Sequence, residues 1–282
     1  MPPTRATTPD GVVLALHDLG GEGPPALLVH ATGFHGQVFS PLAHYLGTRF
    51  RCLALDLRGH GESGVPPDLN FDWAGFGTDV LTAVDALGIE GPVGIGHSCG
   101  GASLLLAEEA RPGTFSALYC FEPIVFASGA LSVPDPSALL ARKARQRREV
   151  FSSRREAYAS YAAKPPLDVL HPDALEAYVE FGFEDLPDGS VRLRCRGENE
   201  ARMYEGGLRH TAFSRLNAVK CPTVIASGAE SRNFARADFE PLVERLVDAS
   251  LEVIPGIGHF GPLEAPSAVS DSVIRDLDPP PA

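Results

Sequence analysis

The stretch Val93-Gly94-Ile95-Gly96-His97-Ser98-Cys99-Gly100-Gly101-Ala102 decides the fold of this 282-residue chain. Residues 92–95 form a short apolar run, typical of a buried strand, and residues 102–110 predict a helix. Between them, residues 96–100 match G-x-S-x-G, in which a serine occupies a sharp turn from strand to helix. Because other segments approach such a turn closely, its flanking residues must be small. We therefore predict that Ser98 lies above the end of a sheet, beside the unpaired N–H groups of a helix N-terminus.

Short apolar runs alternate with helical patterns on both sides of this turn. These runs are 26–30, 50–56, 115–122, 221–228 and 250–255. Continuous apolar runs of this length suit a parallel sheet that is covered on both faces. Alternation of strands and helices indicates crossover helices. The predicted fold class is therefore α/β, a doubly wound and mostly parallel sheet, with an early edge strand at residues 11–16.

The alternation is interrupted in the middle of the chain. Residues 129–211 show helical periodicity, with helices expected over 137–164 and 171–181. Asp188-Gly189 between two short runs predicts a small hairpin. We interpret residues 129–211 as a mainly helical cap, inserted into a core made of residues 1–128 and 212–282. A Pro-rich tail, 278–282, is expected to be disordered.

Composition restricts the classes of partner. A net charge of −12 argues against nucleic acid and against an anionic membrane surface. No apolar run is long enough to span a bilayer, and residues 1–11 lack the apolar core of a secretion signal. Five cysteines without paired spacing are typical of reduced thiols, so we expect a cytoplasmic protein. No Cys and His cluster has metal-ligand spacing, and the expected partner is a small-molecule substrate.

A serine hydroxyl becomes a nucleophile only beside a base, and the base needs an orienting acid. His259 is the candidate base, because it follows the last strand on a Gly-flanked loop. Two backbone N–H groups are expected to hold an oxyanion. One belongs to Cys99, and the other to Thr32 in the loop after the strand that ends at His30.

Four motifs together resemble the α/β-hydrolase fold with a cap domain. They are His30-Ala31-Thr32-Gly33-Phe34, Asp56-x-Arg58-Gly59-His60-Gly61-x-Ser63, Gly96-x-Ser98-x-Gly100 and Gly258-His259-Phe260. The resemblance spans residues 26–277 apart from the cap, and Ala31 and Gly33 depart from the fold's H-G-x-P-type loop. It implies an eight-stranded sheet and acyl hydrolysis by a Ser–His–acid triad, without a metal or an organic cofactor. A serine nucleophile in place of aspartate speaks against the dehalogenase and epoxide-hydrolase branches.

Two carboxylates compete for the role of the acid. The fold usually carries it after the strand that follows the cap, where this chain reads Gly228-Ala229-Glu230-Ser231. Glu230 is one residue early for that position. Some members carry the acid at the end of the strand before the cap, which is Glu122 here. We favour Glu122 over Glu230, because a carboxylate that ends a buried apolar strand needs a partner.

Other residues receive narrower interpretations. Asp56 is expected to tie the loop that follows it, and Cys99 is discounted as a rival nucleophile because it points away from the apex of the turn. Phe34 is expected to line the substrate pocket. The cap carries a group of basic residues, Arg142, Lys143, Arg145, Arg147, Arg148, Arg154 and Arg155. We interpret them as a solvated helix face, with recognition of an acidic substrate as the alternative.

The sequence therefore predicts a hydrolase of a carboxylic ester, thioester or lactone of a small, largely apolar molecule. Ser98 attacks, His259 carries the proton, and Glu122 or Glu230 orients His259. Two alternatives stay open. One is carbon–carbon bond hydrolysis or cofactor-free lyase chemistry on the same triad, and the other is a ligand receptor on this fold.

Overall fold

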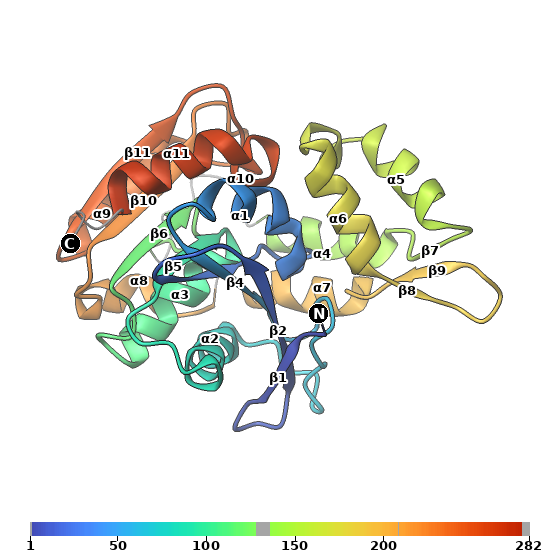
Figure 1. The fold of residues 1–282 in the computed structure, drawn as a ribbon, viewed down its shortest axis with the longest axis horizontal. Helices are drawn as coiled ribbons and strands as arrows, with labels where there is room; N and C mark the ends of the chain where they lie inside the picture. The colour runs from blue at the N-terminus through green and yellow to red at the C-terminus, as the bar shows by residue number, and fades with distance from the viewer. Residues whose placement is uncertain (1, 128–135, 208, 278–282) are drawn as a thin grey trace.

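The computed structural model describes residues 2–127, 136–207 and 209–277. Within these residues, eight strands form one sheet in the order β1-β2-β4-β3-β5-β6-β10-β11 (Figure 1). The strands are β1 Thr4–Thr7, β2 Val13–Gly20, β3 Pro25–Val29, β4 Arg51–Asp56, β5 Val93–His97, β6 Ala117–Phe121, β10 Thr223–Gly228 and β11 Ala249–Ile254. All pairs from β4 to β11 are parallel, whereas β1 and β2 pair antiparallel with their neighbours. The predicted fold class is confirmed.

The predicted edge strand at 11–16 is a strand but not an edge. It forms β2, and β1 pairs with it so that Thr4 lies opposite Leu16 and Thr7 opposite Val13. Ala6 of β1 is buried while its neighbours in the strand are exposed. This short, polar edge strand is therefore held by its backbone pairing with β2 and by one inward-facing apolar side chain.

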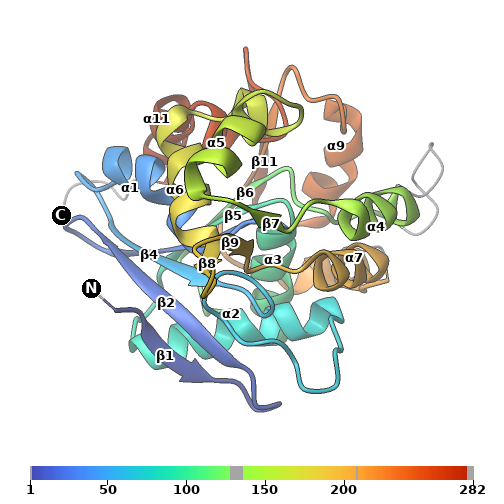
Figure 2. The same cartoon turned by 90° about the vertical axis from the view of Figure 1, so that its right-hand side faces the viewer.

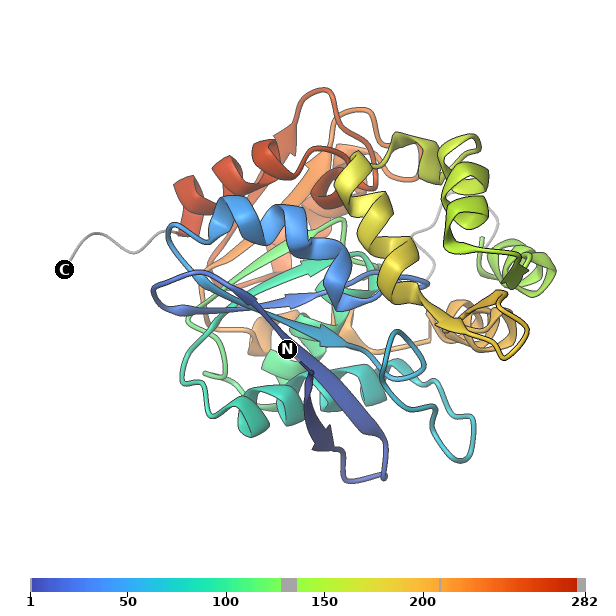
Figure 3. The ribbon, with the colours of Figure 1, turned by 45° about the vertical axis from the view of Figure 1, so that its right-hand side comes forward.

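Helices cover both faces of the sheet, as a doubly wound fold requires. Their bounds are η1 Gly36–Phe39, α1 Ser40–Leu46, α2 Trp73–Leu87, α3 Cys99–Ala110, α8 Ala212–Arg215, η3 Leu216–Ala218, α9 Arg236–Arg245, α10 Gly261–Glu264 and α11 Pro266–Leu277. Leu28 of β3 packs with α1 and α11, whereas Leu27 packs with α2 and α3. Side chains alternate along a strand, so each strand contributes to two apolar clusters. Figure 3 shows α1 and α11 on one side of the sheet and α2 on the other.

Residues 136–207, called the cap segment here, lie between β6 and β10 in the sequence. Its elements are α4 Ser137–Gln146, β7 Val150–Phe151, α5 Arg154–Ala162, η2 Leu167–Val169, α6 Pro172–Gly182, β8 Phe183–Asp185, β9 Val191–Leu193 and α7 Gly197–Gly206. β8 and β9 form the hairpin predicted at Asp188-Gly189, and β7 adds a third antiparallel strand. Helices α4 and α7 lie side by side (Figure 2). The predicted cap boundary at 128/129 and the predicted tail 278–282 lie outside the described residues.

The cap segment packs on the core through α6. Figure 3 shows α6 beside α1, and α6 also contacts η1. Tyr178 and Leu175 of α6 belong to the same apolar cluster as Phe34, Val38 and Leu28 of the core. The loop that follows β3 is therefore enclosed between the sheet and the cap segment. Among the described helices, none combines the length and the apolar character needed to cross a bilayer.

Candidate active site

Ser98 occupies the predicted turn between strand and helix. β5 ends at His97 and α3 begins at Cys99, which leaves Ser98 alone at the bend with φ 56° and ψ −114°. A positive φ is unfavourable for a residue with a Cβ, so surrounding contacts must hold it. The Ser98 N–H donates to the Phe121 carbonyl at 2.8 Å, and the Ser98 carbonyl accepts from the Ala102 N–H at 3.1 Å. Backbone bonds to β6 and α3 therefore hold the strained turn.

The glycines on either side of Ser98 are required by close approach. A Cβ on Gly100 would collide with the carbonyl oxygen of Val29, at the end of β3. A Cβ on Gly96 would lie 2.6 Å from the Gly101 nitrogen. Both contacts involve backbone, which cannot move aside cheaply. Gly100 is thus explained by packing against the end of β3, and Gly96 by packing against the first turn of α3.

His259 and Glu122 are brought together from distant parts of the chain. His259 Nδ1 lies 2.6 Å from Glu122 Oε2. Glu122 is fully buried, and its other carboxylate oxygen, Oε1, accepts from the Gly228 N–H at 3.0 Å. Ser231 Oγ donates to Glu122 Oε2 at 2.9 Å. A buried carboxylate that accepts three hydrogen bonds is well compensated, which satisfies the need for a partner inferred from sequence.

The alternative acid, Glu230, does not join this group. Its side chain is exposed, and its backbone N–H donates to the Ile257 carbonyl. The next residue, Ser231, is the one that turns inward. Ser231 holds the position where the fold usually carries the acid, and its hydroxyl donates to the Glu122 carboxylate.

His97 connects the serine turn to the His259 loop. Its Nε2 lies 2.7 Å from the His259 carbonyl oxygen, and the two rings are 5.0 Å apart between centroids. Burial holds the pKa of His97 well below its usual range, so the ring is neutral and donates from Nε2. Within the described residues, the His259 side chain hydrogen-bonds with Glu122 and not with Ser98. Ser98 and His259 are linked through His97, which directly precedes Ser98 in the chain and hydrogen-bonds the His259 carbonyl.

The loop after β3 is held by two buried histidines. His60 Nε2 accepts the Gly33 N–H at 3.0 Å, and His30 Nε2 accepts the Leu57 N–H at 3.0 Å. Burial lowers the pKa of His30 to about 4, which keeps the ring neutral and able to accept. Thr32 is buried in this loop and contacts the Cys99 thiol. Sequence reasoning missed the role of His60, although His60 lies in a motif that it quoted.

Two further expectations agree with the geometry. Asp56 is buried and accepts hydrogen bonds from His17 at 2.9 Å, Gly36 N–H at 2.6 Å and Glu62 N–H at 2.8 Å, as expected of a structural carboxylate. Burial alone would raise the pKa of Asp56, but the hydrogen bond to His17 and the electrostatic effects of His17, His35 and His30 together lower it. Burial raises the pKa of the Cys99 thiol to about 12, so the thiolate is suppressed.

Phe34, in the loop after β3, lies where the cap segment meets the loop that carries His259. Its ring is 5.3 Å from that of Tyr178 on α6 and 5.8 Å from that of Phe260. Both rings are tilted against it, in the usual manner of packed aromatics. Phe34 therefore belongs to the buried apolar cluster that joins α6 to the loop after β3, and its role in a substrate pocket stays a prediction. Among the described residues, no group of three or more His, Cys, Asp or Glu side chains is arranged to hold a metal ion.

A mostly parallel eight-stranded sheet, with a serine at a strand–helix turn and a His–Glu pair beside it, defines an α/β hydrolase. The chain belongs to the alpha/beta hydrolase family, whose model matches residues 26–272. Its relatives are named as hydrolases and esterases, so the chain is an enzyme of this family.

Named relatives and a solved structure match over nearly the full length. The chain is 24% identical to 2-(acetamidomethylene)succinate hydrolase of Mesorhizobium japonicum, over 92% of this chain and 89% of the relative. It is 26% identical to a putative carbamate hydrolase of a Caulobacter species, over 97% and 98%. The crystal structure of E-2-(acetamidomethylene)succinate hydrolase matches with a TM-score of 0.84 at 21% identity, over 98% of this chain and 99% of that one.

Proposed function

We propose that this enzyme hydrolyses a carboxylic ester, thioester or lactone of a small molecule through an acyl-enzyme on Ser98. The observation that carries the proposal is the 2.6 Å contact between His259 Nδ1 and Glu122 Oε2. A carboxylate at Nδ1 fixes the tautomer in which Nδ1 carries the proton, so Nε2 is free to act as the base.

The reaction follows from these roles. Ser98 Oγ forms a bond to the carbonyl carbon while its proton passes to His259 Nε2, and Glu122 stabilises the imidazolium. The N–H groups of Cys99 and Thr32 hold the oxyanion, and each such donor typically contributes about 10²–10³ in turnover. His259 returns the proton to the leaving alcohol or thiol. Water then repeats the sequence on the acyl-enzyme, releasing the acid and restoring Ser98.

Labelling and turnover of two adjacent variants test the proposal. We expect a fluorophosphonate to label Ser98 in the wild type, and p-nitrophenyl esters to be hydrolysed. Ser98→Ala should abolish both. The Cys99→Ala variant should retain most of the turnover, because residue 99 keeps the backbone N–H that is proposed to hold the oxyanion. Loss of activity in Cys99→Ala with retention in Ser98→Ala would overturn the assignment.

A second candidate reaction is hydrolysis of an acyl–nitrogen bond. Two relatives are named for an acetamidomethylene compound and for a carbamate, which supports it. The same triad serves, but the nitrogen must be protonated as it leaves. Comparing p-nitrophenyl acetate with p-nitroacetanilide distinguishes the two, because an enzyme built for esters should turn over the anilide poorly. If the fluorophosphonate labels Ser98 but neither p-nitrophenyl acetate nor p-nitroacetanilide is hydrolysed, the alternative of carbon–carbon bond hydrolysis would be favoured.

We also propose that the enzyme is located in the cytoplasm. The cysteines Cys52, Cys99, Cys120, Cys195 and Cys221 are all buried and unpaired in the part of the chain that the structure describes. Buried free thiols suit a reducing compartment, which supports a cytoplasmic enzyme.

A further inference from the structure

An ion pair in the cap segment lies directly on the loop after β3. Arg147, just past α4, contacts Glu200 of α7 with 2.5 Å between Nη1 and Oε2. Their side chains are only 19% and 8% exposed. A Cβ on Gly33 would lie 2.7 Å from Glu200 Oε1 and 3.7 Å from Arg147 Nη1. The pair therefore touches the residue next to Thr32, the proposed oxyanion donor.

Arg147 differs in its surroundings from nearby arginines of the cap segment. Arg145 and Arg148 are exposed and form surface ion pairs, with Glu198 and Glu156 respectively. They agree with a solvated helix face. Arg147 is enclosed, and a buried ion pair adds little to stability because desolvation offsets the attraction. A guanidinium in this place is thus better explained by a ligand than by stability.

The surroundings of Arg147 supply hydrogen-bond donors. Its Nη2 donates to Tyr178 Oη at 2.7 Å and to Tyr161 Oη at 3.4 Å. Both phenol oxygens act as acceptors toward Arg147, so each phenol proton is free to donate elsewhere. Burial raises the pKa of Tyr178, which keeps that proton in place. Among the described residues, none accepts the proton of Tyr178. Guanidinium and phenol donors together match a carboxylate.

We propose that Arg147 and Tyr178 bind a carboxylate on the acyl side of the substrate, so that the substrate is a monoester, or another acyl derivative, of a dicarboxylic acid. This inference rests on the proposed acyl hydrolysis at Ser98. Glu200 balances the guanidinium in the free enzyme. Because a guanidinium has five N–H groups along two edges, Arg147 can hold Glu200 and a substrate carboxylate together.

A matched pair of substrates tests the proposal. Mono-p-nitrophenyl glutarate and p-nitrophenyl valerate have acyl chains of equal length, and only the first ends in a carboxylate. We expect wild type to prefer the glutarate ester by about 10- to 100-fold in kcat/KM, as a charged hydrogen-bonded contact would give. Arg147→Gln should abolish this preference and Arg147→Lys should keep part of it. Arg148→Gln, the exposed neighbour, should keep all of it. Equal turnover of the two esters by wild type would overturn the proposal.

A binding measurement remains informative if Arg147→Gln does not fold. In the Ser98→Ala variant, glutarate should raise the Tm, whereas uncharged glutaramide at the same concentration should not. No stabilisation by glutarate would overturn the carboxylate site. Hydrolysis of the valerate ester without any glutarate preference would reject this site and leave the proposed function intact. If Ser98 were not labelled by the fluorophosphonate and neither ester were hydrolysed, both the carboxylate site and the proposed acyl hydrolysis would be rejected.

Discussion

Two residues of the site, Ser98 and Glu122, adopt a positive φ although neither is glycine, at 56° and 43°. Each follows the last residue of a central parallel strand, and their backbones are coupled because Ser98 N–H donates to the Phe121 carbonyl. Glu122 N–H in turn donates to Ala226 of β10. Strain at such positions persists only when neighbouring strands hold it, and it aims side chains off the sheet edge. The neighbouring strands thus aim the proposed nucleophile and the proposed acid.

The first prediction concerns the position of the acid. Glu122→Gln should lower kcat by roughly 10²–10⁴-fold, because an amide no longer balances the imidazolium. Ser231 donates to the Glu122 oxygen that contacts His259, so position 231 is also close to His259. In Glu122→Ala, adding Ser231→Asp should restore at least about tenfold of kcat. Steady-state kinetics on one ester measure both effects. Full activity in Glu122→Gln would remove Glu122 from the mechanism.

A second prediction concerns His97. Its Nε2 holds the His259 carbonyl at 2.7 Å, so we assign His97 as a positioning residue. His97→Leu should lower kcat by about 10- to 100-fold with little change in KM, because displacement of the base by about 1 Å has this effect. His97→Gln retains a donor and should recover part of kcat. Equal losses in the two variants would show that the hydrogen bond is not what matters.

At the scale of elements, α3 runs from the serine turn along the face of the sheet that α2 also covers. It is buried along almost its whole length, including Glu108 and Glu109. Glu108 accepts from the N–H groups of Gly113 and Phe115, which ties the helix end to the following loop. Glu109 Oε1 is buried without a hydrogen-bond partner among the described residues. This helix therefore carries one compensated and one poorly compensated carboxyl group.

The third prediction is a pH dependence of stability caused by Glu109. Burial raises the pKa of Glu109 from an ordinary value near 4.5 to about 8, and nearby Arg215 offsets only part of this. Between those pH values the unfolded chain releases a proton that the folded protein keeps, so the free energy of unfolding falls as pH rises. Glu109→Gln should be more stable than wild type at pH 8 by on the order of 1–3 kcal/mol, and nearly equal at pH 4. Urea unfolding at the two pH values measures this. If wild type were less stable than Glu109→Gln by the same amount at both pH values, a raised pKa of Glu109 would be contradicted.

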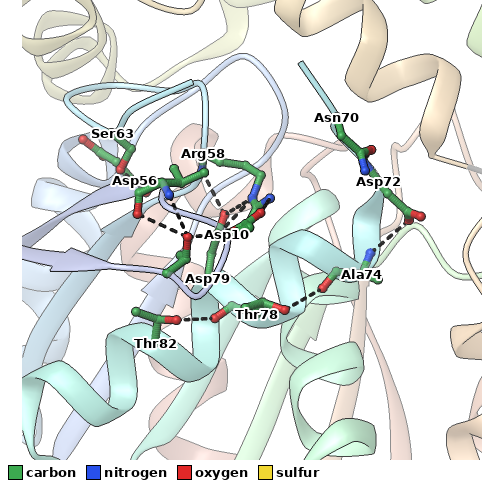
Figure 4. Close-up of polar contacts among 12 residues, drawn as sticks. Asp10, Asp56, Arg58, Ser63, Asn70, Asp72, Ala74, Thr78, Asp79 and Thr82 are labelled. Atoms are coloured by element: carbon green, nitrogen blue, oxygen red, sulfur yellow. Dashed lines mark hydrogen bonds and ion pairs between the residues drawn. The ribbon is translucent and has the colours of Figure 1, made fainter. Parts of the chain in front are cut away.

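For the molecule as a whole, one buried arginine ties three distant segments together. Arg58, in the loop after β4, contacts Asp79 of α2 with 2.7 Å between Nη2 and Oδ1, and Asp10 near the N-terminus with 2.7 Å between Nη1 and Oδ2 (Figure 4). Its side chain is 3% exposed and that of Asp79 is 0% exposed. The same loop contains His60, which holds the Gly33 N–H. The loop after β4 is therefore attached to α2, to the N-terminal segment and to the loop after β3, and removing one partner of the buried pair would leave an uncompensated charge.

The fourth prediction follows from this network. Asp79→Ala leaves the Arg58 guanidinium buried without its main partner, so it should destabilise the fold by about 3–5 kcal/mol. Asp85 lies on the same helix and pairs with Arg111 at the surface, so Asp85→Ala is a matched control expected to cost about 0–1 kcal/mol. Urea unfolding monitored by circular dichroism compares them. Equal effects of the two variants would argue against a special role for the buried pair.

Local spacing alone was enough to predict the serine turn, the candidate base and the alternation of a parallel sheet, because each is a short-range pattern of backbone geometry and burial. It also narrowed the acid to two residues. The sequence favoured Glu122 over Glu230, but the contact of Glu122 with His259, the contact of His60 with Gly33 and the enclosure of Arg147 emerged only in three dimensions. These contacts join residues that lie between 27 and 137 positions apart. Which side chains meet across such separations depends on how strands and cap pack together, and no local pattern encodes that packing.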